Sequence, residues 1–158
     1  MKRDIRILLH DIRSVYNAGA IFRTADAIGA TKMYLSGYTP TPVDRFGNPR
    51  KDFAKSALGS EKTLAWEIAK SPLAVIKSLK KEGFEIIAVE QSGDSIDYKK
   101  MKPAARALII FGNEVSGISQ KILHESDKVA EIPMRGNKES LNVSVSTGIV
   151  LFRWFDRS

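Results

Sequence analysis

A polar loop that leads into an apolar helix occupies residues 131–155. The loop contains a proline, a glycine and an asparagine and has no apolar period, which predicts an irregular segment. From Ser140 onward, apolar residues recur at helical spacing. This stripe consists of Leu141, Val145, Ile149 and Phe152. Other apolar residues fall off the stripe, so we expect the helix to be apolar on several sides and mostly buried. Such a helix, preceded by a polar loop with a glycine, predicts that the loop forms the wall of a site.

The length and charge of the chain limit its class. A chain of 158 residues suits a single domain over 1–158, with no appended RNA-binding domain. No apolar run approaches the ~20 residues that cross a bilayer, and no secretory signal opens the sequence, so we expect a cytoplasmic protein without a membrane partner. The absence of cysteine excludes disulfides and thiolate chemistry, and with two histidines we expect no metal. The net charge of +7 favours a polyanionic partner, most simply nucleic acid.

Predicted strands and helices alternate along the chain, which indicates an α/β domain with a mainly parallel sheet flanked by helices. The predicted strands are Ile5–Asp11, Lys32–Ser36, Phe84–Glu90, Ala107–Phe111 and Lys128–Ile132. The predicted helices are Ala18–Ile28, Lys51–Gly59, Leu73–Lys81, Ser119–His124 and the terminal helix. Asn17 is the predicted N-cap of the first helix, and Gly29 is placed to end it.

Three segments with glycine follow predicted strands, where open parallel sheets bind ligands. In the first segment, 14–23, we expect Arg23 to lie back over Gly19 and Ala20 toward the mouth of a site, because helical side chains lean toward the amino end. The alternative is a surface arginine on an amphipathic helix. The segment contains no G-x-G-x-x-G pattern, which disfavours a nicotinamide-binding Rossmann enzyme.

The other two segments carry polar residues that a core would not need. In 111–119, Gly112 and Gly117 permit close approach of a ligand to the backbone, and Glu114 lies between them. A plain loop with a solvated glutamate is the alternative. In the third segment, Ser140 and Asn142 are candidate N-caps of the terminal helix. Backbone groups of 132–137 could equally read the edge of a purine.

Together the three segments resemble the motifs of the SPOUT superfamily, in particular its SpoU/TrmH-type RNA 2′-O-ribose methyltransferases. Motif one is matched by Asn17-x-Gly19-x3-Arg23-Thr24. Motif two is matched by Phe111-Gly112-Asn113-Glu114-x2-Gly117-Ile118. Motif three is matched by Ile132-Pro133-Met134-x-Gly136-x3-Ser140-Leu141-Asn142-Val143-Ser144. The match extends over essentially the whole chain, and its third motif is specific.

The resemblance implies features that residue patterns alone do not show. It implies a C-terminal deep trefoil knot, in which the terminal helix threads a loop, and a homodimer packed through knot-side helices. It implies S-adenosyl-L-methionine as the cofactor, held in the knot largely by backbone groups. The implied cofactor-binding residues are Gly112, Asn113, Glu114, Gly117, Ile132, Pro133, Met134, Ser140 and Leu141. The implied catalytic residues are Arg23, Asn17, Glu114, Ser140 and Asn142.

Methyl transfer to a ribose 2′-hydroxyl requires in-line alignment of the oxygen with the methyl group, and removal of the hydroxyl proton. Arg23 occupies the position of the family's catalytic arginine. Because a guanidinium is protonated in ordinary settings, we expect Arg23 to bind the adjacent phosphate and to stabilise the developing alkoxide. The other four implied catalytic residues would fix Arg23, the ribose and the phosphate. The final acceptor of the proton stays open.

The implied substrate is tRNA or rRNA. A basic cluster in and after the proline-rich loop is a candidate RNA-binding surface, and a solvated charged face is the alternative. Its members are Arg45, Arg50, Lys51 and Lys55. Two other functions remain: a catalytically silent RNA- or ribosome-binding factor on the same scaffold, and methylation of a base or of a target other than RNA. The joint presence of the five implied catalytic residues argues against the silent factor.

Overall fold

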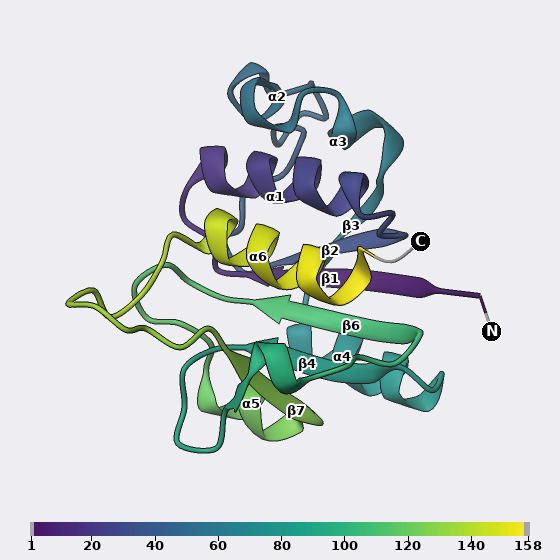
Figure 1. Cartoon of the computed structure of the whole chain (residues 1–158). Coiled ribbons are helices and arrows are strands. Elements are labelled where there is room, and N and C mark those ends of the chain that lie inside the picture. Colours follow the sequence, from purple (N-terminus) through teal and green to yellow (C-terminus); the bar gives the residue numbers. More distant parts are fainter. Residues whose placement is uncertain (1, 157–158) are drawn as a thin grey trace.

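Seven parallel strands form one sheet through the centre of the molecule (Figure 1). The computed structural model describes residues 2–156, and the strand order is β3-β2-β1-β6-β4-β7-β5. The strands are β1 (Asp4–His10), β2 (Lys32–Ser36), β3 (Ala65–Ala69), β4 (Glu85–Val89), β5 (Ile96–Asp97), β6 (Arg106–Phe111) and β7 (Lys128–Glu131). Every ladder between neighbouring strands is parallel. The prediction of a mainly parallel α/β sheet is confirmed.

Helices cover both faces of the sheet (Figure 1). One face carries α1 (Val15–Ala27), α2 (Lys51–Ala57), α3 (Ser60–Thr63) and α6 (Val143–Phe155). The other face carries α4 (Pro72–Lys81) and α5 (Gln120–Glu125). Across residues 2–156, every helix falls short of the length and hydropathy that a bilayer crossing requires.

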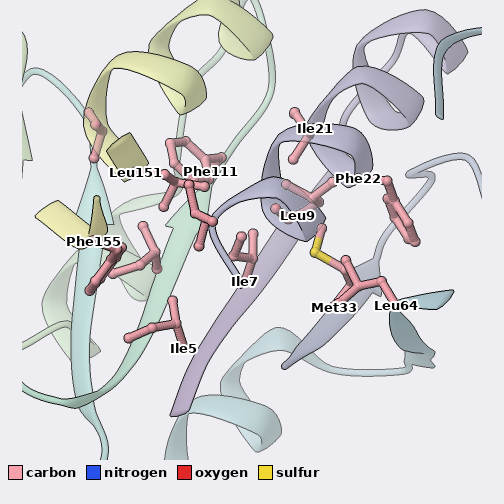
Figure 2. Close-up of a cluster of buried hydrophobic side chains, with 14 of the residues drawn as sticks. Ile5, Ile7, Leu9, Ile21, Phe22, Met33, Leu64, Phe111, Leu151 and Phe155 are labelled. Carbon is pink, nitrogen blue, oxygen red and sulfur yellow. The ribbon is translucent and has the colours of Figure 1, made fainter. Parts of the chain in front are cut away.

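The central strands are buried on both faces, which explains why they read as continuous apolar runs. Successive side chains of β1 point to opposite faces. Ile5, Ile7 and Leu9 join the core cluster beneath α1 and α6 (Figure 2). Leu8 joins the second cluster, beneath α4 and α5. The two clusters bury the strands from both sides, and the loops that follow the carboxyl ends of the strands carry the candidate site.

The first helix begins earlier than predicted, because Ser14 rather than Asn17 is its N-cap. The Ser14 hydroxyl oxygen accepts the backbone N–H of Asn17 at 3.1 Å. The prediction of Asn17 as the cap is therefore wrong: Asn17 lies within the first turn and is only 6% exposed. Gly29 follows the end of the helix as predicted, with a φ of 75° that suits glycine.

The sequence does not predict α3, β3, β5 or the 3-10 turn Tyr98–Lys100. Both missed strands lie at the edges of the sheet, and β3 is mostly exposed. Their sequences carry no apolar run, and pairing with a neighbouring strand decides their conformation.

Helix α6 buries the residues that fall off its predicted stripe. Val150 and Trp154 are buried in the core cluster beneath α1 and α6. Two stripe residues, Val145 and Phe152, are 50% and 44% exposed, so the expectation of burial on several sides is wrong for this face. The indole N–H of Trp154 donates to the carbonyl of Tyr98 at 2.9 Å and fixes the end of the helix. One apolar face of α6 is therefore left without a partner within the described chain.

Candidate functional site

A cavity of 340 Å³ lies at the carboxyl ends of β4, β6 and β7, and we call it the strand-end cavity. The loop 112–118 after β6 and the 132–142 segment after β7 form most of its wall. Most of the residues implied as cofactor-binding line it, namely Gly112, Asn113, Glu114, Gly117, Ile132, Met134, Ser140 and Leu141. Pro133 is the exception, because it does not line the cavity. The position agrees with the general rule for ligands of open α/β sheets.

The loop 112–118 is a tight turn closed by its own backbone. The N–H of Asn113 donates to the carbonyl of Gly117 at 3.2 Å, and the N–H of Gly117 donates to the carbonyl of Asn113 at 3.0 Å. Gly117 has a φ of 69°, which favours glycine. A Cβ on Gly112 would meet the carbonyl oxygen of Gly117 at 2.7 Å. Glycine is needed at both positions for the loop to close.

Asn113 links this loop to neighbouring segments. Its Nδ2 donates to the carbonyl of Asp11 and to the hydroxyl of Tyr38, each at 2.8 Å. Its Oδ1 accepts the N–H groups of Val115 and Ser116, each at 2.8 Å. Within this network Asn113 is only 7% exposed. We therefore expect Asn113 to shape the wall of the cavity rather than to contact a ligand through its amide.

Glu114 joins the same loop to the start of α1. Its carboxylate accepts the N–H of Arg13 at 2.9 Å, the N–H of Ser14 at 3.0 Å and the Nδ2 of Asn17 at 3.3 Å. A carboxylate that accepts N–H groups at a helix amino terminus is stabilised by charge-assisted hydrogen bonds and by the helix dipole. The alternative of a merely solvated glutamate is excluded by these contacts.

Asn142 completes the link between the three motif segments. Its Nδ2 donates to the Oδ1 of Asn17 at 3.2 Å. Its Oδ1 accepts the N–H of Ser144 at 2.8 Å, so Asn142 rather than Ser140 is the N-cap of α6. Glu114, Asn17 and Asn142 thus form one hydrogen-bonded joint, in which Asn17 is buried and uses both ends of its amide.

Replacing Glu114 by glutamine should destabilise the joint. An amide offers one acceptor oxygen where the carboxylate offers two, so one or more of the three N–H groups, two of them part-buried, would lose a partner. The expected loss is about 1–3 kcal/mol of unfolding free energy, measured by urea denaturation. Glu125→Gln is the matched control, because its carboxylate lies 3.8 Å from Lys80 on the surface and contributes about 0–1 kcal/mol. Equal stability of the two variants would contradict a structural role for Glu114.

Arg23 does not reach the strand-end cavity. It is exposed and lines a second cavity of 390 Å³ between α1, α2 and α6, which we call the helix-face cavity. Within residues 2–156 its guanidinium has no hydrogen-bond or ion-pair partner. Gly19 packs against α2, where a Cβ on Gly19 would meet the carbonyl of Phe53 at 2.7 Å. Ala20 does line the cavity beside Arg23.

The first turn of α6 separates the two cavities. Val143 and Ser146 line the strand-end cavity, whereas Ser144 and Val145 line the helix-face cavity. Ser140 lies in the wall of the former. The five implied catalytic residues therefore divide into the joint of three, Ser140 at the strand-end cavity, and Arg23 on the other side of α6.

The four residues of the basic cluster have different surroundings. Lys55 lines the helix-face cavity with Arg23, and Lys51 is exposed at the start of α2. The guanidinium of Arg50 hydrogen-bonds the carboxylate of Asp52 at 2.8 Å and holds the pKa of that carboxyl below its usual range. The guanidinium of Arg45 lies 4.8 Å from the centroid of the Phe46 ring. Lys55 is thus the member placed closest to a candidate catalytic residue.

Sequence reasoning missed Glu90 and Gln91, which also line the strand-end cavity. The carboxylate of Glu90 accepts the N–H of Ile118 at 2.8 Å, and the Nε2 of Gln91 donates to the carbonyl of Glu139 at 2.7 Å. Each residue therefore ties the end of β4 to one of the two loops. Glu90 ends a predicted strand and Gln91 follows it, which was the available signal, because ligands bind at the carboxyl ends of strands.

The same three segments that meet in this geometry are matched by a family model. The SpoU rRNA Methylase family model covers residues 4–152. The chain belongs to this family. The match includes all three motif segments, so the joint and the strand-end cavity both fall inside the SpoU domain.

Relatives of known function support the SpoU assignment. The chain is 32% identical over 151 residues to a tRNA (guanosine(18)-2′-O)-methyltransferase of Aquifex aeolicus, covering 96% of this chain and 68% of that protein. It is 32% identical over 145 residues to a 23S rRNA (guanosine-2′-O-)-methyltransferase of Neisseria meningitidis, covering 92% of this chain and 55% of that protein.

Solved structures of SpoU proteins share the fold. The A. aeolicus TrmH/SpoU tRNA modifying enzyme superimposes with a TM-score of 0.83 at 29% identity, covering 96% of this chain and 74% of that chain. An AdoMet-bound rRNA methyltransferase from Sinorhizobium meliloti superimposes with a TM-score of 0.85 at 28% identity, covering 97% of this chain and 56% of that chain. This chain therefore spans between about half and three quarters of the length of these relatives.

Proposed function

We propose that this SpoU-family chain is an S-adenosyl-L-methionine-dependent methyltransferase that acts on a ribose 2′-hydroxyl of tRNA or rRNA. The observation that carries the proposal is the strand-end cavity, whose wall consists of the motif-two and motif-three loops. The hydrogen-bonded joint of Glu114, Asn17 and Asn142 connects that wall to motif one. The two relatives described above are named as 2′-O-methyltransferases of tRNA and rRNA.

The residues of the strand-end cavity fit S-adenosyl-L-methionine. Ile132, Met134 and Leu141 offer apolar surface for an adenine ring. Glu90 and Glu131 bring carboxylates to the same cavity, which suits a cofactor with a sulfonium and an ammonium group. The tight turn at Gly112 allows close approach of backbone N–H groups to the ligand.

Bound there, the cofactor supplies an electrophilic methyl group. The joint of Glu114, Asn17 and Asn142 would hold the motif loops at a fixed separation, which favours alignment of the ribose oxygen. Arg23, which has no partner among residues 2–156, is available for the phosphate next to the target ribose and for the developing alkoxide. Ser140, exposed at the cavity wall, would contact the ribose.

The proposal is tested by methylation of RNA that lacks the modification. Purified protein and S-adenosyl-L-methionine carrying a labelled methyl group are incubated with tRNA and rRNA from cells without this gene. We expect label in one of the two RNAs, recovered after nuclease digestion as a single 2′-O-methyl nucleoside by mass spectrometry.

Two results would overturn the proposal. Label in a base rather than a ribose would reject the 2′-hydroxyl as the acceptor. Binding of RNA without transfer to either RNA, together with no heat of S-adenosyl-L-methionine binding at millimolar cofactor, would indicate the catalytically silent factor.

We also propose that a second copy of the chain covers the exposed face of α1 and α6. Tyr16, Val145 and Phe152 are 66%, 50% and 44% exposed and line the helix-face cavity together. A Cβ on Gly148 in the same helix would meet no atom within 4 Å, which leaves room for a partner backbone. Apolar groups gathered on one face mark an association site.

Val145→Arg should convert the dimer into a monomer, because burial of a third cation beside Arg23 and Lys55 opposes association. The measurement is light scattering after gel filtration. Ile68→Arg is the matched control, since Ile68 is 63% exposed but lies on the edge strand β3. If the control dissociates the dimer and Val145→Arg does not, the interface lies at the sheet edge.

The trefoil knot implied by the resemblance belongs to the same proposal. Helix α6 returns to the face that carries α1 after the chain has built β7 on the other side of β6 (Figure 1). Its end is held by contacts from Tyr98 and from the Arg3 guanidinium, which donates to the Phe155 carbonyl at 2.5 Å. When the unfolded chain is pulled by its two ends, a knot retains some residues, so the measured end-to-end length should stay below that of 158 extended residues. A measured length equal to that of 158 extended residues would exclude a knot.

A further inference from the structure

Tyr38 is an exposed aromatic residue that is held in a fixed position next to the strand-end cavity. Its side chain lies in the loop after β2 and the residue is 61% exposed. The hydroxyl accepts the Nδ2 of Asn113 at 2.8 Å, and the backbone N–H donates to the Oδ1 of Asp11 at 3.1 Å. Hydrogen bonds thus hold the backbone N–H and the hydroxyl of Tyr38, and the ring between these two groups faces solvent.

Two residues around Tyr38 have left-handed backbone conformations, and one of them is not a glycine. Asp11 is one of two non-glycine residues between 2 and 156 with a positive φ, at 55°, and Gly37 has a φ of 62°. The Asp11 carboxylate pairs with the Nε2 of His10 at 3.3 Å, and the Nδ1 of His10 lies 2.8 Å from the Ser36 hydroxyl oxygen. Strained residues persist only where surrounding contacts hold them, and they gather at functional sites.

This arrangement exposes an aromatic ring where folding would ordinarily bury one. Aromatic side chains contribute to stability mainly through the area that they bury, and Tyr38 buries little. Its connection to the site is direct, because Asn113 belongs to the loop that lines the strand-end cavity. The ring is therefore held at a fixed place relative to the motif-two loop.

We propose that Tyr38 is a stacking platform for an unpaired nucleobase adjacent to the target ribose, so that the substrate is a single-stranded or looped segment of RNA. The inference rests on the proposed RNA methyltransferase function and deepens it. Bases in loops can splay out and stack on aromatic side chains, whereas bases in a duplex cannot. Stacking of this kind contributes ~1–3 kcal/mol per base and tolerates any base, because each has a π-face. The net charge of +7 suits such a polyanionic partner.

The test compares two short unstructured oligoribonucleotides of the same length, one with all its bases and one abasic at every position. Tyr38→Ala should weaken binding of the first by about 5- to 150-fold, the equivalent of one stacked base, and leave binding of the abasic strand unchanged. Tyr38→Phe, which keeps the ring, should retain most of the affinity. In methyl transfer, Tyr38→Ala should raise KM for RNA with kcat at saturating RNA largely kept.

Ile68→Ala is the control, because Ile68 is equally exposed, at 63%, and lies on the edge strand β3. If Tyr38→Ala fails to fold, Tyr38→Leu replaces it with the same expectation. If Tyr38→Ala weakens binding of both oligonucleotides equally, Tyr38 acts through the loop or the phosphates. If it weakens binding of neither, the ring is not involved in RNA binding. Either result overturns the proposal. Calorimetry of the wild type with S-adenosyl-L-methionine reports separately on the proposed methyltransferase function.

Discussion

Replacing Arg23 by alanine is expected to abolish methyl transfer while S-adenosyl-L-methionine still binds. Arg23 lies in the helix-face cavity and contributes no atom to the strand-end cavity, so cofactor affinity measured by calorimetry should stay within twofold of the wild type. Loss of a cation that stabilises a developing oxyanion costs about 100- to 1,000-fold in kcat. Arg23→Lys should restore little methyl transfer, because lysine lacks the planar guanidinium that binds a phosphate through two parallel hydrogen bonds. Normal turnover by Arg23→Ala would remove it from the mechanism.

Arg23 acts either at the strand-end cavity of its own chain or at that of the partner chain in the proposed dimer. Mixed copies of the proposed dimer distinguish these alternatives: one chain carries Arg23→Ala with an intact strand-end cavity, and its partner carries Arg23 with a cavity weakened by Gly112→Ala. The assay uses S-adenosyl-L-methionine at a concentration that fills only the intact cavity. Because α6 separates Arg23 from the cavity of its own chain, we expect the mixed dimer to recover activity that neither parent shows. Absence of recovery would place the arginine at the cavity of its own chain.

Gly112→Ala is expected to weaken S-adenosyl-L-methionine binding strongly. The added Cβ would meet the Gly117 carbonyl at 2.7 Å, and a backbone group cannot move aside as a flexible side chain can. The two backbone hydrogen bonds between Asn113 and Gly117 would then open and the wall of the cavity would shift. Overpacking of this kind costs roughly 1–3 kcal/mol, or about 5- to 150-fold in affinity if it acts on the bound state.

The control for Gly112→Ala is Gly93→Ala, since a Cβ on Gly93 would meet no atom within 4 Å. Both variants are compared by calorimetry and by thermal unfolding. Unchanged cofactor affinity of Gly112→Ala would mean that the loop 112–118 is not part of the cofactor site.

The sequence predicts the buried strands well and the edges poorly. Strands such as β6 are short apolar runs with breakers at both ends, so burial on two faces leaves a clear signal. The edge strand β3 has no such run, because its side chains face water on most positions. Helix α6 shows a third case: its stripe of apolar residues predicts the helix correctly, but that stripe faces outward and the core lies on the other side.

The candidate site divides in the same way. The sequence places Gly112, Glu114 and Met134 at the same edge of one sheet, because all three follow the carboxyl ends of predicted parallel strands. It does not show that Glu114 hydrogen-bonds Asn17, since that contact depends on how α1 leaves β1. Motif spacing also does not show that Arg23 lies apart from the other motif residues. That separation arises because the first turn of α6 lies between the two cavities.

The strand order has a consequence for how the protein is made. The central strand β1 pairs on one side with β2, which follows directly, and on the other with β6, which begins only at Arg106. Parallel pairing between segments so far apart is slow to form. During synthesis, residues 1–105, about two thirds of the chain, are made before β6, and one edge of β1 stays unpaired until then. An open strand edge is a template for aggregation, so a nascent chain of this protein is expected to depend on chaperones until β6 has emerged.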